Sequence, residues 1–188
     1  MGYAIDRASA MSLLQEHLKQ PNMIKHCLAS EAVMRALARH LGEDEEQWGL
    51  AGLLHDLDAE ATAEDLSIHT RQTVKILEEL GIDSVIIDAI AMHNENAHDR
   101  KRSTKFHHAL AAGETITGLI TATALVYPDK KLASVKPKSV RKRIKERAFA
   151  AGANRDIIKE CELIDIPLDD FCDLCLIAMQ EISNDLGL

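Results

Sequence analysis

The sequence predicts an all-α fold, a bundle of several helices. Ala, Leu, Ile, Glu and Lys recur at helical spacing, whereas aromatic residues make up only 3 % of the 188 residues. Runs of alternating β-branched residues, which would indicate strands, are almost absent. A hydrophobic fraction of 46 % is enough to close one core. We therefore expect one helical domain over residues 1–188.

Each expected helix begins at a polar cap or a proline, and ends at a glycine, a proline or a polar loop. The expected helices cover residues 23–41, 45 to about 57, 62–80, 84 to about 94, 105–126, 137 onward with a break at Gly152, 154–164 and 167–186. The segments after residue 137 form a C-terminal group of helices, over about 137–186. The histidines and acids that are candidates for a functional site precede that group, over about residues 20–127.

Composition limits the classes of protein. No run approaches the roughly 18 apolar residues of a membrane span, and the N-terminus does not resemble a signal peptide. We therefore expect a cytoplasmic protein without a membrane partner. The cysteines are too few and too scattered for a disulfide framework, so they are expected to be reduced core residues. The pair Cys172 and Cys175 has CxxC spacing, but its apolar surroundings favour core packing over zinc or redox chemistry.

Charge is unevenly distributed along the chain. The formal net charge is −8, which argues against general binding of nucleic acids. Residues 130–147 are nevertheless rich in Lys and Arg, whereas residues 156–173 are acidic. The basic segment is either a solvated helix face or a surface that attracts an anionic ligand. An RNA-binding role for it would require affinity that weakens steeply with salt.

The doublet His55-Asp56, in AGLLHDLD, is the most informative feature of the sequence. An imidazole and a carboxylate at the end of an apolar helix are costly to bury unless something pairs with them. A metal ion would do so, with other helices completing its coordination. Single candidates for those further ligands occur on other expected helices: His26, His69, His93 and Glu114. Taken alone, a histidine on a helix is more often a surface residue or a hydrogen-bonded core residue than a metal ligand.

The order of these residues resembles the HD-domain superfamily of metal-dependent phosphohydrolases, over roughly residues 20–127. His26 in IKHCLASEAV resembles the first ligand of that superfamily, and the doublet in AGLLHD resembles its His-Asp pair. HALAAGETITGLI resembles the helix that carries the distal acid, but Glu114 replaces aspartate there. The resemblance implies a bundle of the HD-domain type with His26, His55, Asp56 and Glu114 as metal ligands.

Members of that superfamily with two metals have further histidines between the doublet and the distal acid. His69 and His93 fall in that interval, so a second ion is possible. His107 and His108 begin the helix of Glu114. One of them, with His108 as a candidate, would meet a phosphate or a second ion, unless the pair is only the polar start of a helix.

Together these features predict hydrolysis of a small phosphate ester, a nucleotide or a phosphorylated metabolite. Mixed imidazole and carboxylate ligands suit Mn, Fe, Co, Ni or Zn, with Mg also possible, and one or two ions per chain are expected. Such an ion makes water nucleophilic near neutral pH. Asp56, His69 and His93 are the expected catalytic residues. The alternative is a non-catalytic module of the same fold that binds a metal or a nucleotide, and the sequence does not indicate an oligomeric state.

Overall fold

The computed structural model describes residues 4–188, and within that range it contains helices but no strand, which confirms the all-α prediction. The α-helices are α1 (Arg7–His17), α2 (Pro21–Leu41), α3 (Glu45–Leu54), α4 (Arg71–Glu79), α5 (Ser84–His93), α6 (Lys105–Leu125), α7 (Pro137–Lys145), α8 (Arg155–Ile158), α9 (Leu168–Glu181) and α10 (Ser183–Leu186). Short 3₁₀ helices cover Glu95–Ala97 (η1), Leu132–Ser134 (η2) and Lys159–Ile164 (η3). Among the described residues, no helix has both the length and the apolar character needed to cross a membrane.

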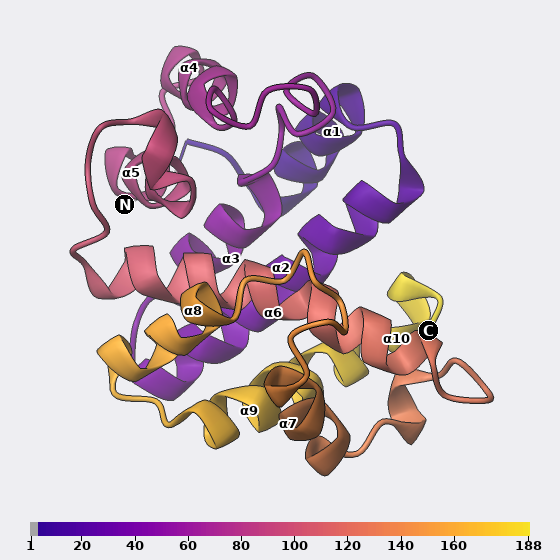
Figure 1. The fold of residues 1–188 in the computed structure, drawn as a ribbon. Helices are drawn as coiled ribbons and strands as arrows, with labels where there is room; N and C mark the ends of the chain where they lie inside the picture. The colour runs from indigo at the N-terminus through magenta and orange to yellow at the C-terminus, as the bar shows by residue number, and fades with distance from the viewer. Residues whose placement is uncertain (1–3) are drawn as a thin grey trace.

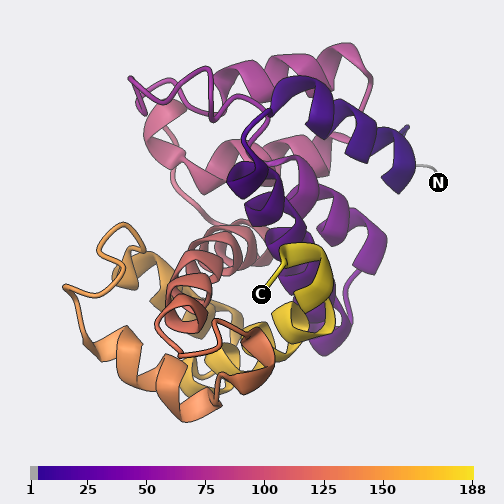
Figure 2. The ribbon, with the colours of Figure 1, turned by 90° about the vertical axis from the view of Figure 1, so that its right-hand side faces the viewer.

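Helix α6 runs through the middle of the molecule (Figure 1). In this view α1, α3, α4 and α5 lie above it and α7 and α9 below it, while α2 crosses behind it, and α6 packs against α2, α5, α8, α9 and η3. Its buried face carries Leu110, Ile116 and Ile120, each fully inaccessible to solvent. The turned view in Figure 2 shows α10, at the C-terminal end, beside α2, which it also contacts. A functional site next to α6 can therefore take residues from both ends of the chain.

Helices α2 and α3 approach each other closely because Gly52 lies at their contact. A Cβ atom added to Gly52 would lie 2.6 Å from the backbone oxygen of Ser30 and 2.9 Å from the backbone nitrogen of Glu31. Only a residue without a side chain allows this approach. The contact places the C-terminal end of α3, where the His-Asp doublet follows, directly beside α2.

The segment between α3 and α4 differs from the sequence prediction. The expected helix over 45–57 ends at Leu54, and the one expected over 62–80 covers only Arg71–Glu79. Residues 55–70 form successive turns. The physical reason is Asp58, whose carboxylate accepts hydrogen bonds from the backbone N–H groups of Thr70, Gln72 and Thr73. This buried side chain caps α4 from outside the helix, which the local sequence does not reveal.

Other element boundaries also differ. Helix α1 lies outside the helices expected from the sequence, and the helix expected over 154–164 divides into α8 and η3. The basic helix is confined to α7. Within it, Arg141 forms an ion pair with Asp173 of α9, and Lys142 lies 3.7 Å from Glu146. These pairs favour the interpretation of the basic segment as an ion-paired surface.

Candidate metal centre

Six polar side chains from different elements meet at one place beside α6. The doublet ends α3, with His55 as the helix cap, and the remaining residues come from α2, α5, α6 and the turn before α4. His55 is completely buried and Asp56 is 7 % exposed. The residues brought together are His26, His55, Asp56, His69, His93 and Glu114.

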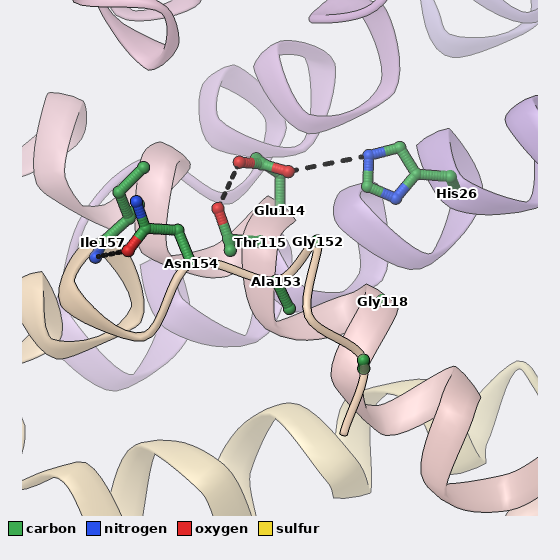
Figure 3. Close-up of a pocket in the computed structure, with 9 residues that line it drawn as sticks. His26, Glu114, Thr115, Gly118, Gly152, Ala153, Asn154 and Ile157 are labelled. Atoms are coloured by element: carbon green, nitrogen blue, oxygen red, sulfur yellow. Dashed lines mark hydrogen bonds and ion pairs between the residues drawn. The ribbon is translucent and has the colours of Figure 1, made fainter. Parts of the chain in front are cut away.

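One part of the cluster lies between α2, α3 and α6. The Nε2 atoms of His26 and His55 are 3.2 Å apart. Asp56 Oδ2 lies 3.5 Å from the first of these nitrogens and 3.4 Å from the second. Glu114 Oε2 lies 3.7 Å from His26 Nε2, so the glutamate reaches the cluster (Figure 3).

The other part of the cluster lies on the second oxygen of Asp56. His69 Nε2 is 3.1 Å and His93 Nε2 is 3.5 Å from Asp56 Oδ1. The two imidazole nitrogens are themselves 3.1 Å apart. The carboxylate of Asp56 therefore stands between two groups of histidines, and one oxygen faces each group.

Hydrogen bonds on the far side of two imidazole rings fix which nitrogen faces the cluster. His55 Nδ1 lies 2.9 Å from the backbone oxygen of Gly52, and His93 Nδ1 lies 2.7 Å from that of Ile90. A carbonyl oxygen can only accept, so each Nδ1 carries the proton. The Nε2 atom of a neutral ring then presents a lone pair to the cluster.

The remaining two rings are held in the same manner. Thr117 donates to the backbone oxygen of Glu114, so its hydroxyl is free to accept from His26 Nδ1, at 2.9 Å. His69 Nδ1 lies 2.8 Å from Asp58 Oδ1. In each case the Nδ1 proton is directed outward, and Nε2 faces inward. Thr117 and Asp58 were not identified from the sequence, although Asp58 stands only two residues after the doublet.

The protonation states reflect this arrangement. Burial lowers the pKa of His55 to about 3, so its ring is neutral. Burial alone would raise the pKa of Asp56, but the surrounding imidazoles, His55 first, outweigh it and hold the pKa well below its usual value. Burial opposes a charge on His69 too, yet the hydrogen bonds to Asp56 and Asp58 raise its pKa to about 10. Burial also raises the pKa of Glu114.

This donor set fits a divalent cation. The Nε2 atoms of His26 and His55 face each other at 3.2 Å, beside carboxylates, so one cation can bind both nitrogens. Two groups have ligand atoms that all lie within 4.8 Å of one another: His26, His55 and Glu114, and His55, Asp56 and His93. Nitrogen and oxygen ligands in this mixture suit borderline transition metals. A cation near His69 would compete with the proton on that ring.

The structure does not bring His107 or His108 to the cluster. His107 Nε2 lies 2.8 Å from Asp88, and His108 Nδ1 lies 2.7 Å from Glu160 in η3. His108 stands about 120° around α6 from Glu114, so its ring faces η3. Its expected role at a second metal or a phosphate has no support in this geometry.

Among the described residues, no cysteine belongs to the two groups with metal-ligand spacing, although Cys27 lies near Asp56 and Glu114. All four are reduced and buried. Burial raises the pKa of Cys161 and of Cys172 to about 12, so neither offers a thiolate for metal or redox chemistry. Within residues 4–188, neither of the two groups with metal-ligand spacing contains Cys172 or Cys175. These observations favour core packing for the CxxC pair.

Comparison with known proteins gives one match. The family model described as HD domain matches residues 23–148, which is more than half of the chain. No curated protein and no solved structure matches the sequence. The matched residues include every member of the cluster.

Proposed function

Because the chain belongs to the HD-domain family, we propose that it is a metal-dependent phosphohydrolase that acts on a small phosphate ester, a nucleotide or a phosphorylated metabolite. The observation that carries the proposal is the convergence of imidazole Nε2 atoms on both oxygens of Asp56. That donor set calls for a cation, and the family is generally one of metal-dependent hydrolases.

His26, His55, Asp56 and Glu114 would hold one ion. His69 and His93 would hold a second one, with Asp56 shared between the two. When bound, a divalent cation supplies Lewis acidity, which polarises a phosphoryl oxygen and makes water more acidic. Mn, Fe, Co, Ni and Zn suit the ligands best.

The side chains of the cluster have separate tasks in this reaction. Asp56 is ionised, so its oxygens can accept a hydrogen bond from the attacking water and orient it. A protonated His69 can donate from Nε2 to a phosphoryl oxygen where a second ion is not bound, because its pKa is raised to about 10. His93 Nε2 lies 3.1 Å from His69 Nε2, beside this donor.

The surroundings of the cluster favour a small substrate. A cavity of about 510 Å³ adjoins His26 and Glu114 and continues under the loop of residues 150–154 (Figure 3). Its volume is in the range of sites for small molecules. The net charge of −8 disfavours long nucleic acids. A nucleotide or a phosphorylated metabolite is therefore a better candidate than a polymer.

A screen of phosphate esters with Mn, Fe, Co, Ni, Zn and Mg tests the proposal. We expect turnover that stops with a chelator, returns when metal is added back, rises with pH toward neutrality and is lost in Asp56→Ala. Asp170→Ala, which removes an exposed carboxylate of α9, is the matched control and should remain active. Two results would count against the proposal: the wild type hydrolyses none of the esters, or Asp56→Ala retains all of its turnover. In either case a non-catalytic module that binds a metal or a nucleotide becomes the better explanation.

A further inference from the structure

A second cavity, of about 490 Å³, lies next to the candidate metal centre, between α2, α6 and residues 186–188. His26 and Gly118 line both this cavity and the one in Figure 3, so the two adjoin at the metal centre. Leu125 and Leu186 give the second cavity apolar walls, and Thr121 adds a hydroxyl. We call it the Lys25 cavity, after the one lysine that lines it.

Lys25 lies one residue before His26 on α2, and its side chain is half-buried in the wall of the cavity. A Cβ atom added to Gly187 would lie 3.1 Å from the Lys25 Nζ atom, so the ammonium rests against that glycine. Lys25 forms no ion pair within the described residues, and no Asp or Glu lines the cavity. Because a half-buried charge is costly without a partner, an anionic ligand in this cavity would gain from pairing with Lys25.

Gly118 lies on the border that the two cavities share, which we call the passage between them. It lies inside α6, one turn after Glu114, and a Cβ atom at this position would meet nothing within 4 Å. Glycine weakens the middle of a helix, and packing does not require it here. The open space over this residue lies where the two cavities meet.

We propose that the Lys25 cavity binds the leaving group of the substrate and that Lys25 binds a second anionic group on it, a phosphate or a carboxylate. This inference rests on the proposed phosphohydrolase function. The substrate class is then a phosphate ester whose leaving group has an apolar body and a negative charge of its own. Hydrolysis joins a water oxygen to phosphorus and breaks the P–O bond to the leaving group, which departs as an alcohol with a proton from the water. Lys25 keeps its contact throughout.

Binding of two phosphonates, which cannot be hydrolysed, tests the inference without turnover. Calorimetry on the metal-loaded protein would compare phenylphosphonate with its meta-carboxylate derivative. We expect the carboxylate to bind about 10-fold more tightly, as a charge-assisted hydrogen bond provides, and Lys25→Met to abolish the difference. Lys19→Met removes an exposed ammonium, whose Nζ atom donates to the backbone oxygen of Gln15, and should leave the difference intact. Equal binding of both phosphonates to the wild type, or a preference that survives in Lys25→Met, overturns the inference.

Filling the passage is an independent test. Gly118→Leu projects into the open space, whereas Gly118→Ala adds only one methyl group. We expect Gly118→Leu to keep its metal and its fold but to weaken binding of the meta-carboxylate phosphonate at least 10-fold, with Gly118→Ala near wild type. Unchanged binding in Gly118→Leu with normal metal content contradicts the inference.

The two proposals fail in different ways. Three substrates separate them: phenyl phosphate, its derivative with a carboxylate at the meta position, and its derivative with a second phosphate at that position. Lys25→Met should raise KM for the two substrates with a charged leaving group, without lowering kcat. Hydrolysis of all three with no effect of Lys25→Met overturns the role of Lys25 but leaves the phosphohydrolase function. An absence of hydrolysis, together with selective phosphonate binding that depends on Lys25, refutes the function but leaves the anion site.

Discussion

Gly52→Ala should destabilise the protein, because it adds a methyl group where the backbones of α2 and α3 touch. The added Cβ atom would lie 2.6 Å from Ser30 O, 2.8 Å from Ser30 C and 2.9 Å from Glu31 N. All three are backbone atoms, so no side chain can rotate away. Nonbonded heavy atoms prefer a separation of about 3.5 Å, so α3 would have to move from α2 by roughly 1 Å.

The magnitude follows from two opposing effects. Overpacking of a core costs about 1–3 kcal/mol, and a clash between two helix backbones belongs at the upper end of that range. Replacing glycine by alanine inside a helix stabilises the folded protein by about 0.5–1 kcal/mol. Gly52→Ala should therefore lower the free energy of unfolding by about 2 kcal/mol. Gly118→Ala, where the Cβ atom meets nothing, should raise it by about 0.5–1 kcal/mol.

Equilibrium unfolding in urea, followed by circular dichroism, measures this difference of about 3 kcal/mol between the two variants. The dependence of unfolding free energy on urea should be the same in both, since the fold is unchanged. Because Gly52 O also holds His55 Nδ1, Gly52→Ala should retain less metal than Gly118→Ala. Equal stability of the two variants would show that the close helix contact is not what requires glycine at position 52.

Two further predictions concern the metal. Protein purified without chelator should carry one or two transition-metal ions per chain, and the double variant His55→Ala/Asp56→Ala should lose them, while His40→Ala at the exposed end of α2 keeps them. Equal metal by elemental analysis in all three proteins would show that the site is wrongly assigned. Glu114→Gln keeps the shape of the side chain but removes its charge, and should weaken metal binding about 10- to 100-fold. Unchanged affinity in a metal titration would remove Glu114 from the site.

The helical fold could be predicted because its signals are local. Periodic apolar residues, Pro21 at the start of α2 and Gly42 at its end are readable from the sequence, and Gly42 does take the left-handed conformation, with φ of 71°. The turns of residues 55–70 could not be predicted from such signals. They depend on the capping of α4 by Asp58, a side chain more than ten residues away from the N–H groups that it binds.

The candidate site, like the fold, could be predicted from the sequence only in part. Residue type and order were enough to select His26, His55, Asp56, His69, His93 and Glu114, and the structure brings these six together; their role as ligands stays a prediction. His108 was selected for its position in the sequence near Glu114, but its ring binds Glu160. Which partner a helical side chain meets depends on the element packed against that face, and η3 was not expected there.

Glu114 illustrates how the fold accommodates a departure from the family pattern. Its side chain is one methylene longer than the aspartate of the resembling proteins, yet its Oε2 atom lies almost as close to His26 Nε2, at 3.7 Å, as Asp56 Oδ2 does, at 3.5 Å. Thr115 donates to the other oxygen and so restricts the longer chain (Figure 3). Thr117, on the same helix, accepts from His26 Nδ1. One helix therefore positions both the carboxylate and the imidazole that faces it, which keeps the glutamate within reach of the ion that His26 would bind.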